Sequence, residues 1–200
     1  MEIRLLPALI LAIALTSCGN ADKNNTHKTV EDTNAIHTDS LKTSENMTHQ
    51  KITPYLWVEK DAKAVADYYL SIFKDGKLID YRTFDSEESG NEAGIETAII
   101  EVAGMEFSIL AAGPLFKFNE AVSFVINTKD QAETDYYWEA LTANGGEEGS
   151  CGWLKDKYGL SWQVIPTEYF DLIHSEDPTV RKKAMENTLK QKKIILAELK

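Results

Sequence analysis

The sequence predicts an α+β fold in which two tandem strand–helix–strand–strand–strand (βαβββ) modules form a curved mixed sheet, followed by a C-terminal helix. Three observations lead to this prediction. The same order of elements occurs twice after residue 51. Apolar residues recur at helical spacing in some stretches and alternate with polar residues, as in strands, in others. Glycine-containing turns separate the elements. The repeat is one of element order and not of closely similar sequence.

The first predicted module contains one helix and four strands. ITPYLWVE (52–59) is typical of a strand, and Asp61 is placed to cap a helix over 61–73, where apolar residues recur at helical spacing. KLIDYRTF (77–84) predicts the second strand, and the polar stretch 85–94 predicts a loop. IETAIIEVA and MEFSILAAG then predict a hairpin that turns at Ala103-Gly104.

The second module is predicted to repeat this order. AVSFVINT (121–128) is typical of a strand, and DQAETDYYWEALTAN predicts a helix with Asp130 near its start and the pair Gly145-Gly146 just past its end. GSCGWLKD and LSWQVIP predict a hairpin around 157–159. The remaining strand is expected to be compressed or lost near Glu147.

A final helix is predicted from about residue 177 to the end of the sequence. Asp177 is placed as its cap and Pro178 at its first position. Its apolar residues are Val180, Ala184, Met185, Leu189, Ile194, Ile195 and Leu196. They form a partly amphipathic face. The opposite face is basic, so a membrane helix is an alternative. We expect this helix to pack on the domain or on a partner subunit instead.

The first 17 residues, MEIRLLPALILAIALTS, are typical of a secretory signal peptide. Arg4 precedes the apolar run Leu5–Leu15, which is too short to span a bilayer. The run ends in LTSCG, which resembles the lipobox of bacterial lipoproteins. The resemblance implies cleavage before Cys18 and its lipidation, which would anchor the protein to a membrane of the bacterial cell envelope, facing the periplasm or the surface. The alternative is an ordinary secretory signal with a coincidental cysteine.

Residues 18–50 are predicted to join the lipidated cysteine to the domain as a disordered linker. Asn, Thr, Asp, Ser and Lys dominate this stretch, which has no aromatic residue. It therefore cannot bury enough apolar surface to offset the entropy of ordering. His27, His37 and His49 lie here, but their separations fit no compact metal site, and we expect them to be solvated.

Composition argues against some partners and some chemistry. The chain has 200 residues and a formal net charge of -11. This charge argues against nucleic acid, because phosphate contacts need clustered Lys and Arg, and against electrostatic docking on anionic lipid. Cys151 is the only cysteine of the predicted folded part, so no intrachain disulfide is expected. A small hydrophobic role is favoured for it over a reactive thiol.

Four stretches together resemble the vicinal oxygen chelate superfamily, which has the glyoxalase and bleomycin-resistance fold. ITPYLWVEKDAKAVADYYLSIF, GPLFKFNEAVSFVI, DQAETDYYWEAL and CGWLKDKYGLSWQVIP are similar to its PhnB-like branch, often labelled 3-demethylubiquinone-9 3-methyltransferase. The resemblance runs from about Ile52 to Leu199 and defines a domain over 51–200. It implies a glyoxalase-like fold, a homodimer, and either small-molecule binding or an isomerase, lyase or oxygenase activity.

The sequence argues against methyl transfer. Enzymes of the common class that use S-adenosylmethionine hold it with a glycine-rich turn between a strand and a helix. The only glycine cluster here, GGEEG (145–149), follows a predicted helix and leads into a predicted strand. No cofactor is therefore predicted.

A bound metal ion is not predicted either. Metal-dependent members of the superfamily place His and Glu side chains on the inner face of the curved sheet. The resemblance assigns those positions to Pro54, Ser108, Ser123 and Gln163. A proline, two hydroxyls and an amide are poor ligands for a divalent ion. An all-oxygen site is the alternative, with the candidates Glu96, Glu101 and Glu106.

Strand alternation predicts a pocket on the concave, or cupped, face of the sheet. It places Ser108, Ser123 and Gln163 there, and turns their bulky apolar neighbours toward the helices. A mainly apolar surface with a few polar groups is typical of a small-molecule pocket. Tyr55 and Trp153 are candidate aromatic walls, with core packing as the alternative. The polar side chains could instead meet water or pair across the sheet.

Three functions remain open from the sequence. The favoured one is metal-free binding of a small molecule in the cupped sheet, by a domain tethered to a membrane. The second is an enzyme of the superfamily with an unknown substrate. Its catalytic residues are unassigned, because the one histidine of the folded part, His174, lies beyond the last strand and is expected at the surface. The third is an interaction module of the cell envelope that uses the C-terminal helix or a dimer surface.

Overall fold

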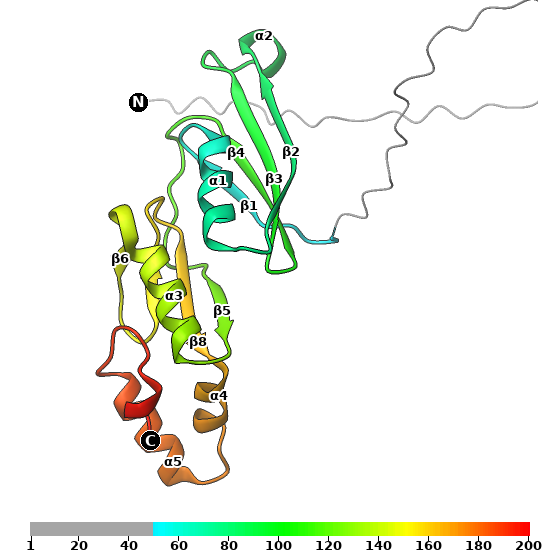
Figure 1. Ribbon diagram of the computed structural model, residues 1–200. Helices are drawn as coiled ribbons and strands as arrows, with labels where there is room; N and C mark the ends of the chain where they lie inside the picture. Colours follow the sequence, from blue (N-terminus) through cyan, green and yellow to red (C-terminus); the bar gives the residue numbers. More distant parts are fainter. Residues whose placement is uncertain (1–49) are drawn as a thin grey trace, which may run out of the picture. The chain divides into compact units, whose positions relative to one another are not determined.

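The structure, a computed structural model, describes residues 50–200 of the chain (Figure 1). The predicted signal peptide, the lipidation site Cys18 and the linker up to residue 49 lie outside the described residues. The α+β fold that the sequence predicts is confirmed for the rest, and the strands form two four-stranded mixed sheets.

The first module has the predicted order of one helix and four strands, with one short helix added. Its elements are β1 (Tyr55–Val58), α1 (Ala62–Ile72), β2 (Lys77–Phe84), α2 (Ser86–Ser89), β3 (Ile95–Val102) and β4 (Met105–Ala111). The strand order is β1-β4-β3-β2, with β1 parallel to β4 and the other pairs antiparallel. The helix α2 was predicted as loop, and the Asp85 side chain starts it by capping the N–H groups of Glu87 and Glu88.

The second module repeats this arrangement. Its elements are β5 (Phe124–Thr128), α3 (Gln131–Thr142), the 3-10 turn η1 (Ala143–Gly145), β6 (Glu147–Glu148), β7 (Trp153–Lys155) and β8 (Ser161–Pro166). The order β5-β8-β7-β6 again pairs the first and last strands in parallel. The strand near Glu147 is compressed to two residues, as expected, so the internal repeat is confirmed.

The predicted helix caps and the first hairpin turn are also confirmed. The side chains of Asp61, Asp130 and Asp177 each accept a main-chain N–H at the start of α1, α3 and α5 (Pro178–Thr188). Between β3 and β4, Ala103 and Gly104 have φ values of 50° and 74°. These left-handed conformations fit the tight turns of hairpins.

One hydrophobic core joins the two modules through the helix-facing sides of their sheets. Phe107, Ile109 and Ala111 alternate into it from β4, and Val65 and Tyr69 enter it from α1. The Tyr69 ring lies 5.9 Å from that of Trp162, and the Phe73 ring lies 5.3 Å from that of Tyr137. In β1 and β4, the intervening residues lie on the opposite face of the sheet and are more exposed.

The C-terminal segment differs from the single long helix that the sequence predicts. A helix α4 (Thr167–Ile173) precedes α5, and α5 ends at Thr188, after which only the 3-10 turn η2 (Leu196–Glu198) is helical. The chain leaves the helix because the carbonyls of Gln191 and Lys192 accept hydrogen bonds from Cys151 and Gly152, at 2.8 and 2.7 Å. No helix within residues 50–200 is long and apolar enough to cross a membrane.

Candidate functional site

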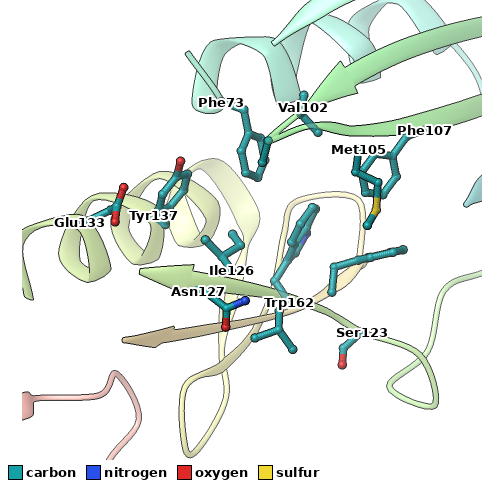
Figure 2. Close-up of a pocket in the computed structure, with 13 residues that line it drawn as sticks. Phe73, Val102, Met105, Phe107, Ser123, Ile126, Asn127, Glu133, Tyr137 and Trp162 are labelled. Atoms are coloured by element: carbon teal, nitrogen blue, oxygen red, sulfur yellow. The ribbon is translucent and has the colours of Figure 1, made fainter. Parts of the chain in front are cut away.

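An aromatic cleft opens beside β5, and five aromatic rings form its walls (Figure 2). They are Phe73, which directly follows α1, Phe107 of β4, Phe124 of β5, Tyr137 of α3 and Trp162 of β8. The ring centroids of Phe107 and Phe124 are 5.0 Å apart, and those of Phe124 and Trp162 are 5.6 Å apart. The cavity volume of about 500 Å³ lies within the range of small-molecule pockets, roughly 300–1,000 Å³.

Polar residues lie toward the two ends of the aromatic cleft. Figure 2 shows Ser123 at one end and Glu133, on α3, at the other. Glu133 accepts a hydrogen bond from the main-chain N–H of Lys129 at 2.7 Å. Within the described part of the chain, Glu133 is the only charged residue that lines the cleft. The cleft therefore combines apolar walls with one carboxylate.

The five residues that the sequence proposes for a pocket lie in two groups, on the faces of the sheets that point away from the helices. Tyr55 and Ser108 are register partners on β1 and β4, and Trp153 and Gln163 are register partners on β7 and β8. The Gln163 amide donates a hydrogen bond to the Ser123 hydroxyl at 2.9 Å. Of the five, only Ser123 also lines the aromatic cleft.

The sequence did not identify the aromatic cleft, although it named several of its residues. Alternation assigns Phe107, Phe124 and Trp162 to the sides of the strands that pack under helices, and these side chains do lie there. The core opens to solvent beside β5, because no further strand covers this edge within residues 50–200. Alternation within one strand carries no information about such an opening.

A buried carboxylate that the sequence did not single out holds one wall of the cleft in place. Asp156 is 2% exposed, and its Oδ2 accepts hydrogen bonds from the Tyr69 hydroxyl at 2.8 Å and the Trp162 indole N–H at 2.9 Å. Its Oδ1 accepts the main-chain N–H groups of Tyr158 and Leu160, at 2.9 and 3.1 Å. Burial raises the pKa of Asp156 above its ordinary value, since it disfavours the charged form.

The residues at the superfamily's metal positions do not fit a divalent cation. Gln163 and Ser123 already hydrogen-bond each other, and both are neutral. Of the alternative carboxylates, Glu101 pairs with Lys77 at 3.3 Å, and Glu96 accepts the Tyr81 hydroxyl at 3.2 Å. Across residues 50–200, no three His, Cys, Asp or Glu side chains are grouped so that they could hold a metal ion.

His174 lies at the surface, where the sequence places it. It follows α4, is exposed, and its ring stacks on that of Phe170 with centroids 6.2 Å apart. It is not among the residues that line the aromatic cleft. It is therefore not placed to exchange a proton with a ligand in the cleft.

The family model for 3-demethylubiquinone-9 3-methyltransferase matches residues 50–165, which span both modules. The chain belongs to this family. It is a PhnB-like member of the vicinal oxygen chelate superfamily. The matched residues end within β8, so α4 and α5 lie outside them.

Solved structures of other proteins are similar to the domain. A PhnB protein from Bacillus cereus, described as a putative 3-demethylubiquinone-9 3-methyltransferase, is 27% identical, with a TM-score of 0.53 over 59% of this chain and 100% of that chain. A protein from Pseudomonas aeruginosa is 22% identical, with a TM-score of 0.48 over 58% of this chain and 97% of that chain. The fosfomycin resistance protein FosX from Listeria monocytogenes is 19% identical, with a TM-score of 0.41 over 59% of this chain and 92% of that chain. No curated protein matches the sequence.

The family is named after a methyltransferase, so the elements on either side of the glycine cluster matter. They are a helix before it and a strand after it, as the sequence predicts. Gly145 and Gly146 follow α3, and β6 begins at Glu147. The cluster therefore leads from a helix into a strand. A turn that holds S-adenosylmethionine in the common class of methyltransferases leads from a strand into a helix.

Proposed function

We propose that the PhnB-like domain binds a small apolar or aromatic molecule in the aromatic cleft, without a metal ion. The observation that carries the proposal is the convergence of five rings on a cavity of about 500 Å³. Transfer of an apolar ligand from water onto such walls is favourable in proportion to the area buried, at about 25 cal/mol per Å². The few polar groups of the cleft, Ser123, Asn127 and Glu133, would orient the ligand.

Binding is a better account of these residues than catalysis. An acid–base or nucleophilic mechanism needs a reactive side chain within hydrogen-bond reach of a partner and of the substrate. The cleft offers one carboxylate, Glu133, and it already accepts a main-chain N–H. The glycine cluster runs in the wrong direction for a methyltransferase of the common class, and the neutral Ser123–Gln163 pair is a poor metal ligand.

The proposal includes a membrane tether and a homodimer. We expect Cys18 to carry the lipid anchor and residues 19–49 to separate the domain from the membrane of the cell envelope. Tyr55 exposes apolar surface on the face of the first sheet that points away from the helices, and a second copy of the chain would cover it. In such a dimer, the cleft of each copy would still be open to a ligand.

The test is a thermal unfolding screen of the protein against small aromatic compounds, with a matched pair of variants. Met105 of β4 lines the cleft and is 42% exposed, and Ala132 is exposed on α3 and is not among the lining residues. A ligand at 100 times its Kd stabilises the folded state by about 2.7 kcal/mol and raises the midpoint. Met105→Trp should fill part of the cleft and abolish this shift, whereas Ala132→Trp should retain it. Equal shifts in both variants, or no shift with any compound, would contradict the proposal.

A further inference from the structure

Charge is distributed unevenly between the C-terminal segment and the rest of the domain. Residues 177–200 carry seven Lys and Arg against three Asp and Glu, a formal net charge of +4. Residues 51–176 carry ten Lys and Arg against 23 Asp and Glu, a formal net charge of -13. The segment that contains α5 is therefore basic, although the whole chain is acidic.

The helix α5 exposes two apolar side chains on its solvent side. Ala184 and Thr188 are buried where α5 packs on the domain, and the other side of the helix faces solvent. On that side Met185 is 44% exposed and Leu189 is 67% exposed. They are four residues apart, so they are neighbours along the helix and form a short apolar ridge.

Three exposed lysines accompany the apolar ridge of Met185 and Leu189. They are Lys182, Lys183 and Lys190. Within the part of the chain that the structure describes, only Lys182 of the three has an acidic partner, Glu186 at 3.8 Å. An exposed pair of this kind contributes little, so the ammonium groups are available to another anionic partner. The ridge and the three lysines together are called the α5 surface below.

The α5 surface has the composition by which a helix lies in the plane of a membrane surface. There, apolar side chains enter the boundary between headgroups and acyl chains, and basic side chains meet anionic lipids. Each lysine near an anionic surface strengthens binding about fivefold. Three lysines and a ridge of two residues therefore give a dissociation constant on the order of millimolar, which is too weak to hold the protein at a membrane.

The proposed lipid anchor would make this weak contact effective. Residues 19–49 join Cys18 to the described domain, and a flexible chain of this length spans about 30 Å on average. Such a tether keeps the domain at an effective concentration of about millimolar beside the bilayer, which matches the affinity of the α5 surface. The acidic remainder of the domain opposes the contact weakly, because charges are screened beyond about 8 Å at physiological salt.

We propose that the α5 surface is the face with which the anchored domain rests on an anionic lipid bilayer. It would orient the domain, while the acyl chains hold the protein at the membrane. No residue of 167–200 lines the aromatic cleft, so the contact would not occupy the cleft. The inference rests on the lipid anchor of the proposed function and adds the surface that meets the membrane.

The test measures lysine accessibility in the full lipidated protein, reconstituted into two kinds of vesicle. One contains phosphatidylcholine and phosphatidylglycerol in equal amounts, and the other contains phosphatidylcholine alone. Acetylation rates are measured by mass spectrometry. In the anionic vesicles, the rates at Lys182, Lys183 and Lys190 should fall about threefold relative to the neutral vesicles. The rates at Lys60 and Lys129, which are exposed elsewhere on the domain, should stay the same.

A matched pair of variants tests the apolar ridge. Leu189→Gln removes an apolar side chain from the ridge, and Leu115→Gln makes the same change at a leucine that is also exposed but lies outside α5. The first should reduce the protection of Lys183 and Lys190 to below about 1.5-fold, because less apolar surface enters the bilayer. The second should retain the threefold protection. Equal protection in the two variants would contradict the role of the ridge.

The outcomes separate this inference from the proposed function. If the protein floats with both vesicles but its α5 lysines react equally in both, or if all lysines slow alike, the inference is wrong and the anchor stands. If the protein does not float, the anchor and the inference are both wrong, and ligand binding in the cleft is still judged by the unfolding screen. If the α5 lysines are protected in intact cells but not in vesicles, the surface binds another molecule and the inference is overturned.

Discussion

At the scale of single residues, Asp156 shows how one side chain joins the two modules. It lies in the turn between β7 and β8. In the sequence this stretch is charged, which is typical of an exposed hairpin turn. Its partner Tyr69 is 87 positions away on α1, and this contact leaves no local pattern in the sequence. Because the carboxylate also accepts the Trp162 indole N–H, it fixes a wall of the aromatic cleft.

Asp156→Asn is expected to destabilise the protein by about 2–4 kcal/mol. An amide N–H₂ in place of Oδ2 cannot accept the Tyr69 and Trp162 hydrogen bonds, and leaving buried donors unsatisfied costs about 1–3 kcal/mol each. Urea unfolding measures the change. The control is Asp67→Asn, which removes only an exposed ion pair with Lys63 and should change stability by less than about 0.5 kcal/mol. Equal stability of both variants would show that Asp156 does not join the modules.

At the scale of elements, the C-terminal segment closes one end of the second module. Ile194 and Leu199 are buried against Ile165 of β8, together with aromatic residues of α4. Gly152 allows this approach, because a Cβ there would lie 2.6 Å from the Ile165 side chain and 3.2 Å from that of Ile194. The segment is therefore part of the folded domain, although the family model does not extend to it.

Removal of residues 189–200 is expected to destabilise the domain by about 3–6 kcal/mol. The estimate corresponds to the loss of two fully buried side chains, Ile194 and Leu199, at roughly 1.5–3 kcal/mol each. Leu189→Ala in the full chain is the control, because Leu189 is 67% exposed and should matter little. Both are measured by urea unfolding. An unchanged midpoint in the truncated protein would mean that the segment does not contribute to the core.

The elements could be predicted well where a local pattern determines them. β2 runs from Lys77 to Phe84 as predicted, and the Asp caps of α1, α3 and α5 follow from side chains next to each helix. The C-terminal helix was predicted too long, because its end depends on hydrogen bonds from Cys151 and Gly152, which are distant in sequence. The Ser123–Gln163 contact fits the predicted shared face, but the aromatic cleft depends on how two modules pack.

At the scale of the whole molecule, the proposed function joins a lipid anchor to a ligand-binding domain. The anchor rests on the resemblance of LTSCG to a lipobox, which lies outside the described residues. The net charge of -11 gives no electrostatic attraction to anionic lipid, so the domain itself would not hold the protein at a membrane. The acyl chains on Cys18 would have to provide the attachment.

Cys18→Ala is therefore expected to move the protein from the membrane fraction to the soluble fraction of bacterial cells. Loss of the acyl chains removes several buried hydrocarbon tails, each contributing about 0.8 kcal/mol per CH₂ group. Fractionation followed by immunoblotting measures the distribution. Cys151→Ala is the control and should stay with the membrane. Retention of Cys18→Ala in the membrane fraction would rule out the lipid anchor.

The position of the ligand tests the central claim of the account most directly. Amide and indole chemical shifts of the protein, with a chelator present, would be mapped by NMR during titration with the best compound from the unfolding screen. The account predicts shifts at Ser123 to Asn127, at Glu133 and at the Trp162 indole N–H. Shifts confined to Tyr55, Ser108 and Trp153, on the faces of the sheets that point away from the helices, would contradict it.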